Sequence, residues 1–209
     1  LTRETDTLDT FVDSSWYQFR YTSPSHASAP WDQAALKQWA PVDQYTGGAE
    51  HAVMHLLYAR FFTKALRDLG LLHFGEPFKR LYNQGHIIAQ HAKMSKSRGN
   101  VITPDTYVKT YGADIVRTYL MFLGPWDQGG QWNDNGIKGV ARWMNRIWEL
   151  VHLDPKEFPC KNHDDNPNKN IERLLHKTLK KSLTDLENFK FNTMLASLME
   201  FTNGLQQSW

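Results

Sequence analysis

A strand–helix–strand succession in the middle of the chain places the strongest constraint on its fold. Gln44-Tyr45 leads into Gly47-Gly48, a pattern typical of a strand-to-helix turn. An apolar helical run covers residues 50–69, and residues 79–88 are again typical of a strand. This order predicts two parallel strands joined by a helix, and therefore an α/β layer. Because apolar residues lie on nearly every face of the run, we expect its helix to be buried on all sides.

Flanking segments extend this prediction in both directions. Residues 1–22 mix β-branched and aromatic residues with Asp and Ser, which predicts a short strand running into a loop or helical turn. Residues 23–30, with two prolines and three serines, are predicted to be a loop, and residues 31–39 a short helix. Thr103-Pro104 is expected to start another helical region. Gly112 should interrupt that region before it ends at Gly124.

The last third of the chain has a different pattern, because its apolar residues recur at three- and four-residue steps. This spacing predicts amphipathic helices over residues 137–151, 171–186 and 195–205. Asn192 is a plausible N-cap of the last one, and the polar segment 154–168 is predicted to be a linker. Short connections favour antiparallel packing. The sequence therefore predicts an α/β domain over residues 1–124 and an all-α helical bundle over residues 125–209.

Composition excludes some classes of protein. The chain has 209 residues, 41% of them hydrophobic and 22% charged, which is typical of a soluble globular protein with one or two domains. No apolar run approaches the roughly 20 residues that cross a membrane. A net charge of +2 is too small to indicate a nucleic-acid binder by itself. The one cysteine, Cys160, permits no internal disulfide and fits a cytoplasmic location. The start lacks Met, and we expect a piece of a longer protein.

The segment Lys93-Met94-Ser95-Lys96-Ser97 carries the clearest functional signal. Two ammonium groups lie three positions apart, and Arg98-Gly99-Asn100 follows at once. The segment is too charged for a core strand and too rich in Ser and Gly for a stable helix. It predicts a mobile cationic loop suited to bind a polyanion, because Lys neutralises phosphate as a compact point charge. A solvated basic turn with no ligand is the alternative.

Three segments in order resemble a known family. Residues 93–97 resemble the KMSKS signature of class I aminoacyl-tRNA synthetases. Residues 45–61 and 4–17 resemble segments of the catalytic domain of leucyl-tRNA synthetases. The valine and isoleucine enzymes have a different sequence in the segment that corresponds to residues 4–17. The resemblance implies the C-terminal half of a Rossmann-like nucleotide-binding domain, followed by a helical bundle that begins the anticodon-binding domain. It also implies a reaction of leucine with ATP, accompanied by Mg²⁺, and transfer of the leucyl group to tRNA(Leu).

The resemblance assigns residues to ATP. Lys93 and Lys96 would be catalytic, because their charges would stabilise the pyrophosphate that leaves in the first step. The full set of expected ATP contacts is Gly47, Gly48, Glu50, His86, Lys93, Met94, Ser95, Lys96 and Ser97. Glu50 is expected on the ribose, although it is also a favourable first-turn acid. Ser95, Ser97 and Asn100 are expected to hold the loop by hydrogen bonds.

Leucine would be bound by aromatic, hydroxyl and imidazole side chains. The expected residues are Phe11, Ser14, Tyr17, Tyr45, His51 and His55. The alternative is that the aromatics and histidines belong to the core. His51 and His55 lie four residues apart and are expected on one helix face. Their spacing invites a zinc site, but Ala52 stands where metalloproteases carry Glu, and no third ligand is evident, so we predict no metal.

A basic stripe is predicted on the second helix of the bundle. Lys169, Arg173, Lys177 and Lys181 repeat every four residues, opposite the leucines of the same helix. The family resemblance implies that they contact the tRNA backbone, which would position the RNA without reading its sequence. A solvated helix face is the alternative.

Parts of the family pattern are missing from this sequence. The His-x-Gly-His signature of class I synthetases is not found, and there is no length for an editing domain. We therefore predict that the isolated chain neither forms adenylate nor charges tRNA. Two alternatives stay open: another aliphatic class I synthetase (for valine, isoleucine or methionine), and a non-catalytic tRNA-binding module. The sequence does not indicate an oligomeric state.

Overall fold

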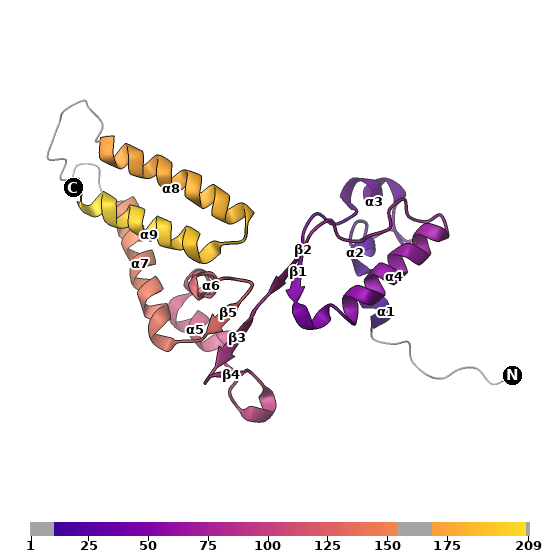
Figure 1. Ribbon diagram of the computed structural model, residues 1–209, viewed down its shortest axis with the longest axis horizontal. Coiled ribbons are helices and arrows are strands. Elements are labelled where there is room, and N and C mark those ends of the chain that lie inside the picture. Colours follow the sequence, from indigo (N-terminus) through magenta and orange to yellow (C-terminus); the bar gives the residue numbers. More distant parts are fainter. Residues whose placement is uncertain (1–10, 154–168, 208–209) are drawn as a thin grey trace. The chain divides into compact units, whose positions relative to one another are not determined.

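A computed structural model describes residues 11–153 and 169–207. The chain divides into two compact units, Leu1–Gln84 and Gly85–Trp209, and each has its own sheet and its own hydrophobic cluster. The first unit is coloured indigo to purple in Figure 1 and the second magenta to yellow. The domain boundary predicted at residue 124 lies inside the second unit and stays a prediction. No described helix is both long and apolar enough to cross a membrane.

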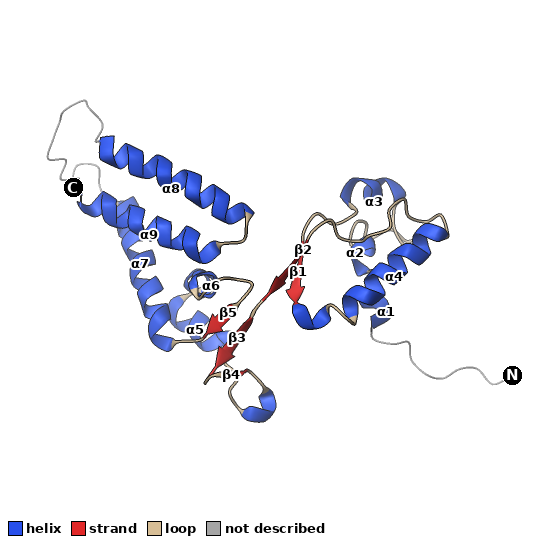
Figure 2. Ribbon diagram, viewed as in Figure 1, coloured by secondary structure: helices blue, strands red, loops and turns tan. Residues whose placement is uncertain are grey.

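The first unit combines short helices with a parallel strand pair (Figure 2). Its elements are α1 Phe11–Ser14, α2 Tyr17–Arg20, α3 Gln33–Trp39, β1 Tyr45–Gly48, the 3₁₀ turn η1 Ala49–His51, α4 His55–Asp68 and β2 Leu81–Gln84. Strands β1 and β2 pair in parallel, with Tyr45 opposite Leu81 and Gly48 opposite Gln84. The predicted strand–helix–strand unit is therefore confirmed.

Residues 11–20 form the short helices α1 and α2, in agreement with the helical turn expected to follow a strand, and none of the described residues of this segment is in a strand. The Ser15 hydroxyl donates to the carbonyl of Phe11, one helical turn back. Short polar side chains of this kind satisfy local backbone groups and favour turns over strands. The helical turn from Trp16 to Phe19 also brings both rings against Trp31. Residues 1–10 lie outside the described residues.

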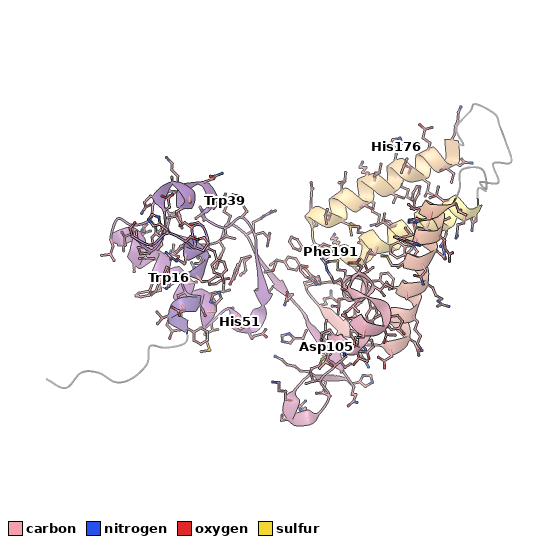
Figure 3. The ribbon with its side chains drawn as sticks, turned by 180° about the vertical axis from the view of Figure 1, so that it is seen from behind. Trp16, Trp39, His51, Asp105, His176 and Phe191 are labelled. Atoms are coloured by element: carbon pink, nitrogen blue, oxygen red, sulfur yellow. The ribbon has the colours of Figure 1, made fainter. Side chains whose placement is uncertain are left out.

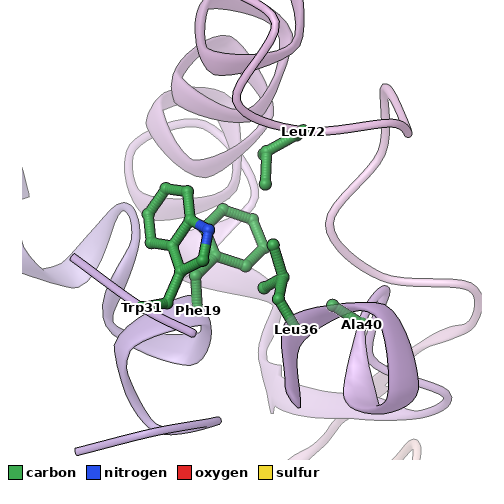
Figure 4. Close-up of a cluster of buried hydrophobic side chains, with 5 residues drawn as sticks. All are labelled: Phe19, Trp31, Leu36, Ala40 and Leu72. Carbon is green, nitrogen blue, oxygen red and sulfur yellow. The ribbon is translucent and has the colours of Figure 1, made fainter. Parts of the chain in front are cut away.

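Aromatic packing forms the core of the first unit. Figure 4 shows the cluster, which consists of Phe19, Trp31, Leu36, Ala40 and Leu72. Helix α3 starts after Asp32, whose carboxylate accepts from the backbone N–H of Ala35 at 2.8 Å, as N-cap residues do. The predicted helix over residues 31–39 is thus confirmed with its start two residues later. The loop before it is fixed by the Arg20 guanidinium, which donates to four of its backbone carbonyls.

Helix α4 is not buried on all sides, so that prediction is wrong. Leu56, Ala59 and Thr63 face the interior of the first unit. Leu57 and Phe61, one turn apart on the opposite side, are 57% and 67% exposed. Apolar side chains on every face make a helix compatible with burial on all sides. They do not supply the neighbouring elements that would cover it.

The second unit consists of a small sheet and six helical segments, among the described residues. Its elements are β3 His86–Ala89, β4 Ala92–Lys93, the 3₁₀ turn η2 Lys96–Arg98, α5 Pro104–Tyr111, α6 Ala113–Phe122, β5 Gly129–Gln131, α7 Asp134–His152, α8 Lys169–Glu187 and α9 Phe191–Gln207. Strand β3 pairs antiparallel with β4 and parallel with β5. Helices α5 and α6 connect β4 to β5, with Gly112 between them as predicted.

The strand expected over residues 79–88 is interrupted at Gly85. Strand β2 ends at Gln84 and β3 starts at His86, and the two strands belong to different sheets. A Cβ at Gly85 would lie 2.1 Å from the backbone of Gln128 and Gly129. Only glycine permits this approach, which leads into the pairing of β3 with β5.

Helices α8 and α9 are connected by a short turn and pack side by side (Figure 1). Two details differ from the prediction. Helix α9 starts at Phe191, so Asn192 lies inside its first turn and not at its N-cap. The buried residues of α8 are Thr178 and Asp185, whereas the leucine stripe, Leu175, Leu179, Leu183 and Leu186, is exposed. The linker predicted over residues 154–168 lies outside the described residues.

Candidate functional site

A pocket of about 420 Å³ lies in the first unit along β1 and β2 and extends to their carboxyl ends. Its lining residues are Phe11, Ser14, Tyr17, Tyr45, Thr46, Gly47, Gly48, His51, His55, Leu56, Leu81, Asn83 and Gln84. All six residues expected to bind leucine are among them, together with both glycines expected to contact ATP. Ligand sites of α/β layers commonly occur at this edge of a sheet. The structure thus brings four separate stretches of sequence around one cavity.

A chain of hydrogen bonds connects the polar side chains of the pocket. The hydroxyls of Tyr17 and Tyr45 are 2.9 Å apart, and the Tyr45 hydroxyl lies 2.7 Å from His55 Nε2. The Tyr45 ring stacks on Phe78 with ring centres 3.8 Å apart. The position of the Tyr45 hydroxyl is therefore fixed from two directions, by stacking and by hydrogen bonding.

Burial determines the protonation states of Tyr45 and His55 in this hydrogen-bonded series. Burial raises the pKa of the Tyr45 hydroxyl well above its ordinary value, and the hydrogen bond with Tyr17 raises it further. Burial also lowers the pKa of His55, and the neighbouring His51 adds to this effect. Both groups are consequently uncharged at neutral pH. An apolar pocket with a few neutral polar anchors can accept an aliphatic side chain without leaving a charge unpaired.

His51 and His55 do not share one helix, contrary to expectation. His51 ends η1, and His55 begins α4 after a break at Met54. Their rings still lie near each other, with centres 6.4 Å apart and nearly perpendicular planes. Figure 3 shows His51 on the turn that follows β1. Among residues 11–153 and 169–207, no group of three or more His, Cys, Asp or Glu residues could hold a metal ion.

The two glycines at the end of β1 differ in their surroundings. A Cβ on Gly47 would meet no atom within 4 Å, although the residue lines the pocket. A Cβ on Gly48 would lie 2.2 Å from the Glu50 carboxylate, which folds back over the strand end. Neither packing nor a positive φ therefore explains glycine at position 47. Open space over exposed backbone is what close approach of a flat ligand needs.

The predicted cationic loop lies in the second unit, between β4 and α5. Lys93 ends β4, and Lys96 begins η2. Both lysines and Ser97 are exposed, whereas Met94 and Ser95 are half-buried. The Lys93 ammonium donates to His86 Nε2 at 3.2 Å. His86, expected near the adenine, therefore contacts a loop lysine. The residues assigned to ATP consequently belong to two units, with Gly47, Gly48 and Glu50 in the first.

The basic stripe runs along α8 as predicted, but its members differ. Lys169, Arg173 and Lys177 are exposed. Lys181 instead forms an ion pair of 2.8 Å with Asp185, whose side chain is nearly buried. The same carboxylate oxygen accepts from the Thr193 hydroxyl of α9 at 2.7 Å. Lys181 therefore belongs to a contact that joins the two helices.

Comparison with known proteins decides the family. The family model for class I tRNA synthetases (I, L, M and V) matches residues 1–131. This chain belongs to the class I tRNA synthetases. Its sequence is 57% identical to a leucine–tRNA ligase of Dehalococcoides mccartyi over 97% of the chain, and 55% identical to one of Herpetosiphon aurantiacus over 98%. In both cases it spans about a quarter of the relative's length, 25%.

Solved structures agree with this family. The fold matches a LeuRS of Agrobacterium radiobacter K84, solved as a ternary LeuRS–tRNA–LeuAMS complex, with a TM-score of 0.85 and 41% identity. The match covers 98% of this synthetase chain and 28% of that one. A methionyl-tRNA synthetase of Mycobacterium tuberculosis matches with a TM-score of 0.62 at 16% identity, which supports the fold alone.

Sequence reasoning missed five pocket residues of this synthetase. They are Thr46, Leu56, Leu81, Asn83 and Gln84. Three of the five belong to β2, which pairs with β1 and ends at the same edge of the sheet. The available signal was the parallel pairing itself: once two strands are expected side by side, every residue of the second strand should be searched, from Leu81 to Gln84.

Proposed function

We propose that this chain is part of a leucine–tRNA ligase, in which it binds leucine, MgATP and tRNA(Leu). The observation that supports the leucine assignment best is the single pocket that collects Phe11, Ser14, Tyr17, Tyr45, His51 and His55. Identity of 57% to a leucine–tRNA ligase supports the same conclusion. A cytoplasmic location, where tRNA is charged for translation, is part of this proposal.

In the first reaction, a carboxylate oxygen of leucine attacks the α-phosphorus of ATP. The new O–P bond gives leucyl-adenylate, and the bond to the β-phosphate breaks with its electron pair on pyrophosphate. Phe11, Leu56 and Leu81 supply apolar wall to the pocket for the leucine side chain. The neutral hydroxyl of Tyr45 and the imidazole of His55 supply polar anchors. A substrate with a charged side chain would find no counter-charge among these groups.

The nucleotide is held by the remaining assigned residues. Gly47 leaves backbone open for close approach, and the Glu50 carboxylate, which lies over Gly48, accepts hydrogen bonds from the ribose hydroxyls. His86 contacts the nucleotide near its base. Lys93 and Lys96 stabilise the charge that grows on pyrophosphate, which lowers the barrier because that charge is larger in the transition state than in bound ATP. Mg²⁺ enters with ATP and neutralises part of the phosphate charge.

In the second reaction, the 2′-hydroxyl of the terminal adenosine attacks the leucyl carbonyl carbon, and AMP leaves. The stripe on α8 contributes phosphate contacts to tRNA(Leu). The strongest candidates are its exposed members Lys169, Arg173 and Lys177, because Lys181 is engaged in the ion pair with Asp185. We expect Arg173→Ala to weaken tRNA binding and to reduce the slope of log affinity against log salt by about 1. Lys181→Ala should instead destabilise the α8–α9 pair, because it leaves Asp185 without its ion-pair partner.

The amino-acid dependence of ATP–pyrophosphate exchange tests the proposal. The complete ligase that contains this chain should exchange pyrophosphate with leucine and much more slowly with valine, isoleucine or methionine. Preference for one of those three would assign the chain to another class I enzyme. Absence of exchange combined with salt-dependent tRNA binding would indicate a non-catalytic module. The 209-residue chain alone should show no exchange.

A further inference from the structure

Asn100 stands out as a buried polar residue at the base of the cationic loop. Asn100 is only 7% exposed, whereas the four residues before it, Lys96, Ser97, Arg98 and Gly99, are all exposed. A buried amide is costly unless its donors and acceptor are hydrogen bonded. The residue therefore indicates a local structure that depends on those bonds.

Three hydrogen bonds join the Asn100 amide to the loop backbone. Its Oδ1 accepts from the Ser95 N–H at 2.8 Å, and its Nδ2 donates to the carbonyls of Ala89 and Lys93 at 3.2 and 3.3 Å. Ala89 ends β3, Lys93 ends β4, and Ser95 precedes η2. One side chain thus ties together three points of backbone, and one of them is Lys93 itself.

The chain between these points is short and closes on Asn100. Gly99 has a φ of 67°, in the left-handed region that glycine adopts at little cost, and its N–H donates to the Lys96 carbonyl. This turn brings Asn100 back beneath Lys93 and Ser95. The Ser95 and Ser97 hydroxyls, 2.8 Å apart, add a contact across the turn. The backbone of the loop is consequently held while both lysine side chains stay exposed, with the Lys93 ammonium on His86.

We propose that Asn100 is a positioning residue for leucine activation, which acts by fixing the backbone from which Lys93 and Lys96 reach the pyrophosphate. The proposal rests on the function proposed above. Asparagine fits this position because aspartate would keep the acceptor for Ser95 but place carboxylate oxygen against two carbonyl oxygens. A displacement of a catalytic group by about 1 Å can cost roughly 10²-fold in rate.

The test uses the complete ligase and steady-state ATP–pyrophosphate exchange. Asn100→Ala should lower kcat roughly 10²-fold with the KM for leucine changed by less than about twofold, because the leucine pocket belongs to the other unit. Asn188→Ala is a matched control, since the Asn188 amide also donates to a backbone carbonyl, that of Thr184 at 2.7 Å, but follows α8. It should leave exchange unchanged. Asn100→Asp provides a second variant of nearly equal volume and should also lose kcat.

A double-mutant cycle separates positioning from general damage. Because Asn100 acts through both loop lysines, Asn100→Ala added to the Lys93→Ala, Lys96→Ala pair should be no slower than that pair alone. The proposal would be overturned if the loss from Asn100→Ala and the loss from the lysine substitutions multiplied. It would also be overturned if Asn100→Ala and Asn100→Asp both kept kcat within about twofold of wild type. A wild-type ligase inactive with leucine would refute the proposed function instead, so the two failures are distinguishable.

Discussion

The pocket of the first unit and the cationic loop of the second hold their functional groups in opposite ways. In the pocket the side chains themselves are fixed: Tyr45 is stacked on Phe78 and hydrogen bonded to Tyr17 and His55. In the loop the backbone is tied by one buried amide, and the lysine side chains are exposed. Choosing an aliphatic side chain depends on the shape of fixed walls. Stabilising charge that develops during reaction depends on charges that can reach it.

The largest expected effect concerns the packing behind the pocket. Phe19 is fully buried against Trp31 and Phe74, and Phe19→Ala should lower the free energy of unfolding by about 3–5 kcal/mol. Thermal denaturation of the complete ligase measures the change. Trp39→Ala removes an aromatic side chain that is 65% exposed and should have little effect. Equal losses in the two variants would show that the Phe19 cluster does not hold this region together.

The loop should respond in rate and not in stability. Lys96→Ala is expected to lower kcat for pyrophosphate exchange by roughly 10²–10³ while the KM for leucine stays nearly constant. Lys37→Ala, which removes an exposed lysine from α3, is the control and should leave kcat unchanged. A large rise in the KM for leucine with Lys96→Ala would contradict the division of tasks between loop and pocket.

The hydroxyl of Tyr45 should contribute to leucine binding. Tyr45→Phe retains the stack on Phe78 but removes the hydrogen bonds to Tyr17 and His55. We expect the KM for leucine to rise about tenfold, since the half-buried polar groups of Tyr17 and His55 lose their partner. Tyr21→Phe, at a side chain that is 72% exposed, should leave KM unchanged. An effect of Tyr45→Phe on kcat alone would assign this hydroxyl to the chemistry.

The smallest effect is a pH dependence carried by His55. Its folded pKa lies below the ordinary 6.5, because burial, and then His51, disfavours the charged form. The unfolded chain therefore binds more protons between these two pKa values, and stability falls as the pH drops through 6.5. His55→Asn should remove this part of the decrease in a series of thermal denaturations above and below that pH. An identical pH series for both proteins would contradict the assignment.

Much of the site followed from residue patterns. The loop was evident from two lysines among serines, and the parallel strand pair from glycines placed between a strand and a helix. The pocket set was assembled through family resemblance, not spacing, because Phe11 and Tyr45 are far apart in the chain. Leu81 and Asn83 escaped notice, since nothing local marks a strand end as part of a cavity. Asn100 was expected to hold the loop, but its three partners became evident only in the fold.

By itself, the sequence determined the family, the order of the main helices and of the parallel strand pair, and the types of side chain available for binding a nucleotide and an aliphatic amino acid. These properties depend on local periodicity and on short sequence motifs, which can be recognised one segment at a time. Only the tertiary structure decided that α4 leaves Leu57 and Phe61 exposed and that Gly85 separates two sheets. Each of these outcomes depends on which elements become neighbours, and contact between distant segments leaves no local pattern in the chain.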